Sequence, residues 1–474
     1  MPLTPDLRRA VDQIRDYMWA GGYPDPMQNA EQLSFLFYFY LAEGADAVRV
    51  RAARRPGADP YESAFSGEWT LRNPLNAQSQ GQIAVPAERL RWSHWANALN
   101  GDRLVTWLRD EVFPFFADRA GNGPVNFLDG ARLQLDEPTV LSQVVSKVND
   151  LRLETLDADT KGDLFEHVLR QTKQAGELGQ FRTPRNVIRA IVEMLDPVIG
   201  ETVYDPAAGT AGFLIAAFDH IRLANSDQVE EVEVDGKTLR RGHGERLGRE
   251  AARQLHEAAF YGNDVDARMV RLATMNLSLR GLDRTRILRR DALTRPLSRA
   301  DKAELGLPAK GFDVVLANPP FSGKLDADRI VDEVRVGSTK ATELLFLQYM
   351  LNQLKPGGRC GVIVPEGVLF GSTGAHKELR RRLMENNTVE AVLSLPGGVF
   401  NPYSGVKTSV LVFRKGGTTG RVMFLHADAD GYKLDANHDQ PIEADDLPGL
   451  VAAFESREEL WEDWQDRDPA AEWT

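Results

Sequence analysis

Short apolar, β-branched runs alternate with longer helical patterns over the middle of the chain. Strands that alternate with helices in this way predict an α/β fold with a doubly wound, largely parallel sheet. The expected strands are Thr202–Tyr204, Ala259–Gly262, Arg286–Leu288, Asp313–Leu316, Arg359–Val364, Val389–Leu395 and Thr408–Phe413.

The first 150 residues have a different pattern, with apolar residues at helical spacing. Leu7–Ile14 and Asn29–Leu36 are the clearest cases, and the second runs into an aromatic stretch, Phe35–Tyr40. This stripe suits either a helical core or a platform for stacking bases, and helical spacing favours the core. Between the first helix and the second strand of the sheet, a charged insertion runs from Asn225 to about Glu257, and its Val234–Lys237 predicts a hairpin turn.

One strand ends abruptly at a polar residue. The buried run Val314–Ala317 is followed by Asn318, Pro319, Pro320 and Phe321. Proline cannot donate to a sheet ladder, so the chain leaves the sheet here, at the carboxyl end of a strand where α/β sheets bind ligands. The Asn318 amide and the Pro319 carbonyl offer two acceptors to one amino group, and Phe321 can stack on a flat ring. A simple loop after an asparagine turn is the alternative.

A glycine turn follows an earlier strand. Val203–Asp205 is followed by a turn of small residues and then by a helix that begins near Leu214. Gly209 and Gly212 allow backbone N–H groups to approach a ligand at a helix N-terminus. A glycine turn alone is weak evidence, because dinucleotide sites use the same geometry. Here, however, the acid comes first and Gly-x-Gly-x-x-Gly is absent.

Together these segments resemble the methylase subunit of type I restriction–modification systems, from about Asp159 to Lys415. Asn318–Phe321 resembles the catalytic motif of DNA amino-methyltransferases, and Asp205–Gly212 resembles their S-adenosylmethionine loop. Gly176–Arg185 resembles the segment that contacts the amino-acid end of the cofactor. The order of these motifs is that of the gamma group of adenine-N6 methyltransferases.

The resemblance implies a Rossmann-like S-adenosylmethionine-dependent methyltransferase sheet, an all-α N-terminal domain and a short C-terminal extension. The expected domains are residues 1–150 (helical), 151–427 (catalytic) and 428–474 (acidic extension and subunit contact). The catalytic residues implied are Asn318, Pro319, Pro320 and Phe321. The cofactor-binding residues implied are Gln180, Phe181, Arg182, Thr183, Pro184, Arg185, Asp205, Gly209, Thr210, Ala211, Gly212, Asp264 and Asp291.

Several of these roles have structural alternatives. Asp264, at the end of its strand, is placed to accept both ribose hydroxyls, or it caps the following helix. Asp291 would accept from the adenine amino group of the cofactor, or it caps a turn. Ala211 stands where many relatives have glycine, while Gly209 and Gly212 keep the spacing. Phe400 or Tyr403 closes the base pocket, or packs within its loop.

Charge and cysteine content limit the possible partners. The net charge is −12, but residues 428–474 hold 15 acidic and 3 basic residues, so the remainder is neutral. DNA affinity comes largely from phosphate neutralisation, so the chain alone should hold DNA poorly. The single cysteine, Cys360, makes a thiolate zinc site implausible and suits a buried strand. We expect no metal site, no membrane span and a location in the bacterial cytoplasm.

The expected reaction is methyl transfer from S-adenosylmethionine to adenine N6 in double-stranded DNA. The resemblance implies a separate specificity subunit, a second methylase subunit joined through it, and in restriction a motor–nuclease subunit. Gly405–Thr408 is not a phosphate loop, so no motor is evident in this chain. Alternatives are amino methylation of cytosine N4, RNA or protein glutamine, and a catalytically silent scaffold.

Overall fold

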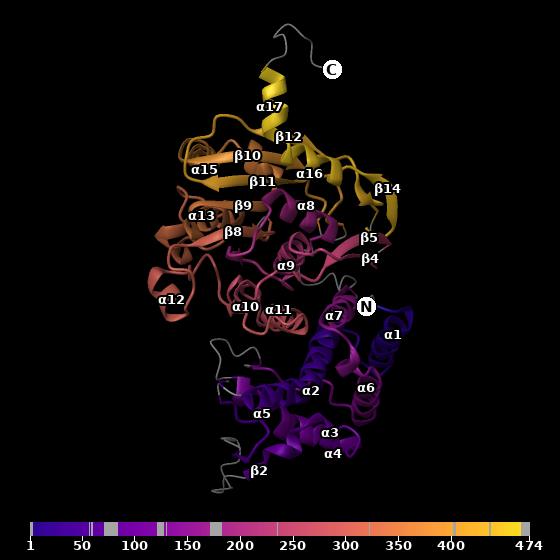
Figure 1. Cartoon of the computed structure of the whole chain (residues 1–474). Helices are drawn as coiled ribbons and strands as arrows, with labels where there is room; N and C mark the ends of the chain where they lie inside the picture. The colour runs from indigo at the N-terminus through magenta and orange to yellow at the C-terminus, as the bar shows by residue number, and fades with distance from the viewer. Residues whose placement is uncertain are drawn as a thin grey trace. The chain divides into compact units, whose positions relative to one another are not determined.

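The computed structural model describes residues 3–55, 57, 60–70, 84–120, 128, 130–170, 183–234, 236–321, 323–401, 404–435 and 438–465. The chain forms two compact units (Figure 1). The helical unit comprises Met1–Glu177 and Arg271–Asp283, and the sheet unit comprises Leu178–Val270 and Arg284–Thr474. Helix α11, Ala267–Leu279, crosses the boundary between them.

The helical unit is built mainly from helices. Its elements are α1 (Pro5–Ala20), α2 (Pro26–Ala53), β1 (Glu68–Thr70), β2 (Ala84–Pro86), η1 (Ala87–Leu90), α3 (Trp92–Trp95), α4 (Gly101–Trp107), the π-helix η2 (Leu108–Val112), α5 (Phe113–Ala120), α6 (Pro138–Asp150), η3 (Leu153–Thr155) and α7 (Ala158–Arg170). The antiparallel pair β1–β2 corrects the prediction of an all-α domain. Its inward residues, Trp69 and Val85, alternate with exposed ones over only three positions per strand, too few to stand out in the sequence.

The aromatic stripe of the sequence forms the core of this unit. Phe35, Phe37 and Phe39 on α2 are buried, and the Phe39 ring stacks on Phe116 with centroids 4.6 Å apart. Phe35 meets the edge of Phe113 at 5.3 Å. Helix α2 begins sharply because the Asp25 carboxylate accepts from the Met27 amide at 2.9 Å. The stripe therefore packs the helices together and is not exposed for stacking bases.

The sheet unit carries the remaining elements. They are α8 (Arg185–Leu195), β3 (Val203–Asp205), α9 (Gly212–Ala224), β4 (Val229–Val234), β5 (Lys237–Gly242), α10 (Arg249–Ala258), β6 (Phe260–Asp264), β7 (Arg286–Arg289), α12 (Arg299–Glu304), β8 (Phe312–Ala317), η5 (Ala327–Arg329), η6 (Asp332–Val334), α13 (Thr342–Gln353), β9 (Leu354–Pro365), α14 (Glu366–Phe370), α15 (Gly374–Asn386), β10 (Asn387–Ser394), β11 (Thr408–Lys415), β12 (Met423–His426), β13 (Asp430–Tyr432), β14 (Pro441–Asp445), α16 (Leu447–Glu455) and α17 (Arg457–Gln465).

Eight strands form the central sheet in the order β12-β10-β11-β9-β8-β3-β6-β7. Strands β7, β6, β3, β8 and β9 run parallel to one another, whereas β11 is antiparallel to both β9 and β10. All seven predicted strands lie in this sheet. The predicted α/β fold with a largely parallel sheet is therefore confirmed. The predicted hairpin turn is confirmed too, since β4 and β5 pair antiparallel up to Val234 and Lys237.

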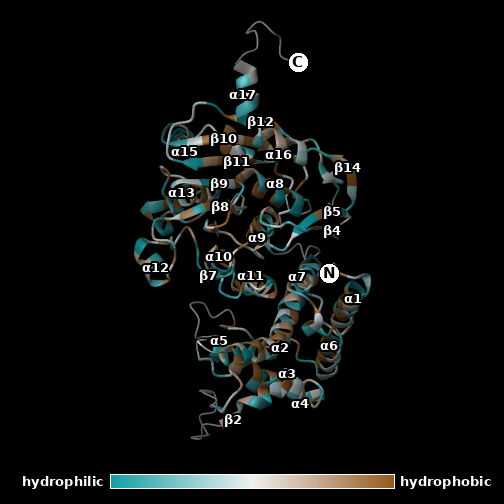
Figure 2. Ribbon diagram, in the orientation of Figure 1, coloured by the Kyte–Doolittle hydropathy of each residue, from teal (hydrophilic) through white to brown (hydrophobic). Residues whose placement is uncertain are grey.

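The middle of the sheet is strongly apolar, as Figure 2 shows for β8 to β11. Residues Val314–Ala317 of β8 are completely buried, as expected for a strand with helices on both faces. Cys360 lies in β9, is fully buried, and has a thiol whose pKa is raised well above its ordinary value by that burial. It is therefore a core residue, as its sequence context indicated.

The two units divide the chain at different positions from the predicted domains. Helix α7, which begins the segment that resembles the family, belongs to the helical unit. Residues after Asp428 pack within the sheet unit as β13, β14 and α16. Asp430 is fully buried; its Oδ2 accepts from Asn186 Nδ2 on α8 at 3.0 Å and lies 2.9 Å from His438 Nε2. The acidic composition of the segment concealed this buried network.

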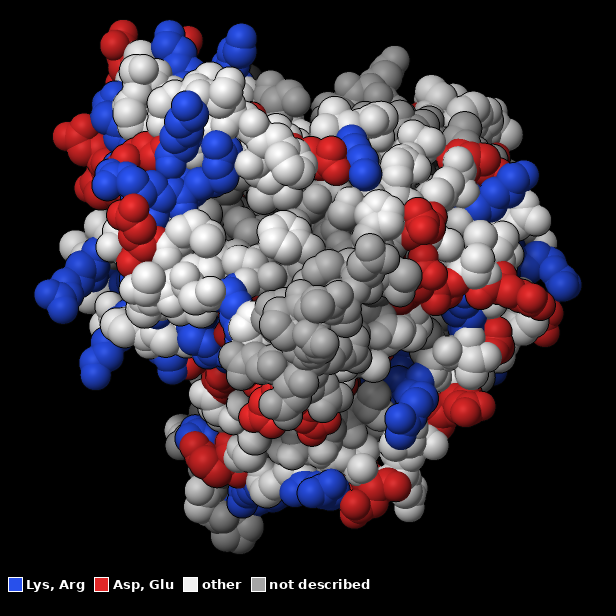
Figure 3. Space-filling model, turned by 90° about the horizontal axis from the view of Figure 1, so that it is seen from above, with Lys and Arg blue, Asp and Glu red and all other residues white. Residues whose placement is uncertain are grey.

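Acidic and basic side chains are intermingled on the face of the molecule seen in Figure 3. This mixture agrees with the neutral balance of the chain outside its acidic C-terminal residues. None of the described helices is both long and apolar enough to cross a membrane.

Candidate active site at the carboxyl edge of the sheet

The sheet brings four of the predicted site residues to one edge. Asp205 ends β3, Asp264 ends β6, Asn318 directly follows β8, and Asp291 follows β7 by two residues. Because these strands are parallel neighbours, their carboxyl ends meet at the same edge. Strand β3 is where the sheet order reverses, with β6 on one side and β8 on the other. Ligands bind at such switch points in α/β sheets.

The glycine turn between β3 and α9 has left-handed backbone conformations at two positions. Gly209 has φ of +50° and Ala211 has φ of +67°. A Cβ built on Gly209 would meet no atom within 4 Å, so this stretch of backbone borders open space. A Cβ on Gly212 would lie 3.1 Å from Ile188 Cδ1, so glycine there allows α9 to pack against α8. The turn thus presents backbone to a ligand.

Ala211 shows why glycine is preferred at its position. A left-handed conformation costs an L-residue with a Cβ roughly 1–2 kcal/mol. The fold tolerates this because the Ala211 methyl is completely buried and its N–H donates to the Ala208 carbonyl at 2.7 Å. The departure from glycine therefore leaves the turn intact.

Two carboxyl groups beneath the turn are poorly solvated. Asp205 is 1% exposed, and burial raises its pKa to about 8, helped by the nearby charge of Asp264. Burial also raises the pKa of Asp264. Asp264 Oδ2 accepts from the Gly209 amide at 3.0 Å and Oδ1 from the Asp266 amide at 2.9 Å. Asp264 therefore stabilises both the glycine turn and the turn that follows β6. Its contact with a ribose stays a prediction.

Asp291 is engaged in capping a turn. Its Oδ1 accepts from the amides of Leu293 and Thr294 at 2.9 and 3.2 Å, while Oδ2 lies 3.9 Å from Arg329 Nη2. The turn-capping alternative is thus observed. Its second oxygen faces a cation, and the predicted contact with an adenine amino group is not tested by this arrangement.

Asn318 has one satisfied and one unsatisfied end. Its Nδ2 donates to Thr183 Oγ1 at 2.9 Å, whereas its Oδ1 is buried and has no hydrogen-bond partner among the described residues. A buried acceptor without a partner costs about 1–3 kcal/mol. Phe321 follows Asn318 by three residues and is buried. Its ring makes an edge contact with the ring of Phe400, with centroids 5.6 Å apart. The structure therefore joins two of the aromatic residues predicted for a base pocket.

The remaining predicted residues are placed only in part. Pro184 is the N-cap of α8, Arg185 is its first residue, and Thr210 lies in the glycine turn. Gln180, Phe181, Arg182 and Tyr403 lie outside the described residues.

Asn263 is a residue that the sequence patterns did not single out. It is 1% exposed, and its Nδ2 donates to the carbonyls of Pro206 and Arg290 at 3.0 and 3.1 Å. Its Oδ1 accepts from the buried Tyr204 hydroxyl. Asn263 thus ties together the carboxyl ends of β3, β6 and β7. The signal available in the sequence was an amide side chain directly before Asp264, the acid that ends the strand.

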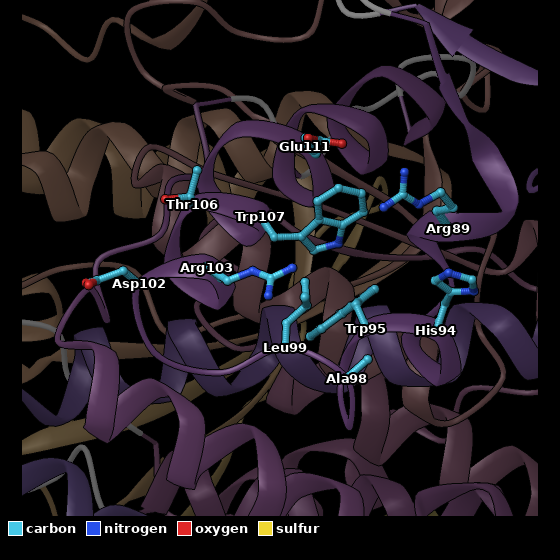
Figure 4. Close-up of a pocket in the computed structure, with 10 residues that line it drawn as sticks. All are labelled: Arg89, His94, Trp95, Ala98, Leu99, Asp102, Arg103, Thr106, Trp107 and Glu111. Carbon is cyan, nitrogen blue, oxygen red and sulfur yellow. The ribbon is translucent and has the colours of Figure 1, made fainter.

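A separate cavity of about 500 Å³ lies in the helical unit (Figure 4). Its lining includes Trp107 at the end of α4 and Glu111 in the π-helix, with Arg89 5.3 Å from the centre of the Trp107 ring. None of the predicted site residues lines it. The cavity is therefore distinct from the sheet edge at which Asp205, Asp264 and Asn318 lie.

Comparison with known proteins identifies the family. The profile of the N-6 DNA Methylase family matches residues 156–468. The chain is 32% identical to the methylase subunit of the type I restriction enzyme EcoEI from Escherichia coli, over 75% of this chain and 69% of that protein. It is also 32% identical to the EcoKI methylase subunit from Escherichia coli K12, over 60% of this chain but only 50% of that protein.

Solved structures agree at the level of the fold. A modification subunit of a putative type I restriction enzyme from Vibrio vulnificus YJ016 superposes with a TM-score of 0.70 at 24% identity, covering 96% of this chain and 91% of that one. A chain from a structure that describes complex assembly of the type I restriction–modification system superposes with a TM-score of 0.66 at 28% identity, covering 98% of this chain and 83% of that one. The chain therefore belongs to the N-6 DNA methylase family, and its predicted resemblance to the methylase subunits of type I restriction–modification systems is confirmed.

Proposed function

We propose that this chain transfers a methyl group from S-adenosylmethionine to adenine N6 in DNA. It would act as the methylase subunit of a type I restriction–modification complex, in the bacterial cytoplasm, with sequence recognition supplied by a separate specificity subunit. The observation that carries the proposal is the Asn318 amide, whose Oδ1 is a buried acceptor without a described partner at the carboxyl edge of the sheet.

The residues at this edge suit the cofactor. The open space beside Gly209 leaves room for a ligand against the backbone. Asp205 and Asp264 supply carboxyl groups for an amino-acid or ribose end, and no phosphate has to be accommodated. When bound, S-adenosylmethionine supplies an electrophilic methyl carbon. These features support the assignment of Asp205, Gly209 and Asp264 to the cofactor site, and we propose the same role for Thr210, Ala211, Gly212 and Asp291, which lie at the same edge of the sheet.

The chemistry expected of the chain is positioning and hydrogen bonding. The lone pair of an adenine amino group is delocalised into the ring, so the nitrogen is a poor nucleophile. Asn318 Oδ1 and the Pro319 carbonyl would accept its two hydrogens and favour a more tetrahedral nitrogen. Alignment and electrostatic complementarity then provide the acceleration without a covalent intermediate. The base must leave the duplex, and Phe321, backed by Phe400, would hold it.

The partners proposed are the specificity subunit, a second methylase subunit joined through it, double-stranded DNA and, for restriction, a motor–nuclease subunit. The chain has no net positive charge with which to hold DNA alone. We therefore expect the isolated chain to bind cofactor weakly and not to methylate specific DNA. The exposed acidic residues of α17 are our proposed contact with another subunit.

The test compares Asn318→Ala with Asn352→Ala in the complex assembled with the specificity subunit. Asn352 is an exposed amide on α13 of the same unit and serves as the matched control. Transfer of a tritiated methyl group to DNA is measured, and the label is mapped to a nucleoside. Asn318→Ala should reduce transfer by about 10²–10³-fold, as loss of a preorganised hydrogen-bonding group does elsewhere.

Three results would contradict the proposal. Label in cytosine, RNA or protein would assign a different amino methylation, and unchanged activity of Asn318→Ala would remove the amide from the reaction. Failure of the wild-type complex to transfer any methyl group would favour a scaffold.

A further inference from the structure

The side chain of Thr183 contacts the catalytic amide. Its Oγ1 lies 2.9 Å from Asn318 Nδ2 and accepts a hydrogen bond from it. Thr183 is only 7% exposed, so water competes poorly for this bond. The resemblance places Thr183 among the residues that contact the cofactor, which stays a prediction, and in the structure its hydroxyl accepts from Asn318.

In the structure this bond occupies the donating end of the amide and leaves the accepting end available. An amide group has one accepting end and one donating end, and only the accepting end can bind an amino hydrogen. With Nδ2 held by Thr183, Oδ1 is the end without a described partner. A rotated amide would present N–H groups to the adenine amino group, and two donors cannot pair. The orientation of this one side chain therefore decides whether the site can bind its substrate productively.

The backbone that carries Thr183 is firmly anchored. Thr183 precedes Pro184, the N-cap of α8, and the Pro184 carbonyl accepts from the Ile188 amide at 3.0 Å. In the first turn of the helix, Asn186 donates to the buried Asp430 carboxylate at 3.0 Å. Ile188 of the same helix packs closely against the glycine turn, because a Cβ built on Gly212 would lie 3.1 Å from Ile188 Cδ1. Helix α8 thus fixes Thr183 relative to the glycine turn.

We propose that Thr183 is a positioning residue that orients the Asn318 amide, so that Oδ1 faces the amino group to be methylated. The inference rests on the proposed function, because it assumes that an amino group is the acceptor of the methyl group. It assigns Thr183 to the chemical step and not to cofactor affinity. The hydroxyl is the required group, so a serine at position 183 should retain the function of the threonine.

The test uses Thr183→Val, which removes the hydroxyl and keeps the shape, and Thr183→Ser, which keeps the hydroxyl. Thr238→Val is the matched control, because Thr238 is an exposed threonine on β5 whose hydroxyl donates to Glu233. All variants are assayed in the assembled complex. The cofactor Kd is measured by titration calorimetry, and the rate of methyl transfer is measured in a single turnover at saturating cofactor and DNA.

Thr183→Val should reduce the single-turnover rate about 10–100-fold, the factor expected when a buried N–H loses its partner and the amide rotates. Its cofactor Kd should stay within about threefold of wild type, and Thr183→Ser should recover most of the rate. Thr238→Val should match wild type in both measurements.

Two results would overturn the inference. One is a cofactor Kd weakened enough to account for the whole loss, which would make Thr183 a cofactor contact. The other is a Thr183→Val rate equal to wild type. A wild-type complex with no methyl transfer would instead refute the proposed function, so the two failures are distinguishable.

Discussion

The buried carboxyl of Asp205 makes the stability of the sheet unit depend on pH. Burial raises its pKa to about 8 from an ordinary value of 3.8. The folded protein therefore keeps a proton on Asp205 over a pH range in which the unfolded chain has lost it. Stability contributed by this proton is fully present below about pH 4 and is lost as pH rises through about 8.

The magnitude follows from the two pKa values. Between pH 6 and pH 8, one group with pKa of about 8 in the folded state and 3.8 in the unfolded state lowers the free energy of unfolding by about 2 kcal/mol. Asp205→Asn should abolish this contribution, because an amide does not titrate. Its oxygen can still accept from the Ala207 amide, which lies 3.0 Å from Asp205 Oδ1.

The assay is urea unfolding of wild type and Asp205→Asn at several values between pH 6 and pH 8. All other titrating groups are shared, so the difference between the two proteins isolates Asp205. The variant should gain about 2 kcal/mol relative to wild type over this range. Asp328→Asn, at an exposed aspartate, should follow wild type. Parallel unfolding free energies for wild type and Asp205→Asn would refute the burial argument.

Three further changes test other parts of the site. Gly209→Ala should lower the free energy of unfolding by about 1 kcal/mol, because Gly209 has a positive φ, and should weaken cofactor binding measured by calorimetry. Gly200→Ala is the control, because Gly200 has φ of +93° and equally open space around it; it should cost similar stability without loss of cofactor affinity. Asn263→Asp should lower the free energy of unfolding by about 2–4 kcal/mol, because it buries a carboxyl group and loses both donated hydrogen bonds; an unchanged urea midpoint would contradict this. Phe321→Leu should weaken retention of the extrahelical base about 10-fold, reported by 2-aminopurine fluorescence at the target position; an unchanged signal would argue against stacking.

The sheet and its catalytic edge could be predicted because their signals are local. Each strand is a short apolar run, and Asp205, Asp264 and Asn318 stand at the end of a strand or directly after it. Asn318 and Gly209 were therefore placed from neighbouring residues alone. Parallel pairing then determines that these strand ends meet, without any knowledge of side-chain contacts.

Other features depend on contacts between distant residues, which a single sequence does not reveal. The bond between Asn318 and Thr183 joins residues 135 positions apart, and that between Asn186 and Asp430 joins residues 244 apart. The buried role of Asp430 was hidden within an acidic segment, so the sequence suggested an extension where the structure has packed strands. Asn263 was likewise masked by the more conspicuous acid beside it.

The single sulfhydryl of this protein has a practical consequence. Cys360 is sealed in the middle of the sheet and holds its proton tightly, so alkylating reagents should leave the folded chain unmodified. A cysteine introduced at an exposed position would then be the sole point of attachment for a dye or spin label. Two such cysteines, one in each unit, would allow distances between the units to be measured while partner subunits and DNA are added, without first removing Cys360.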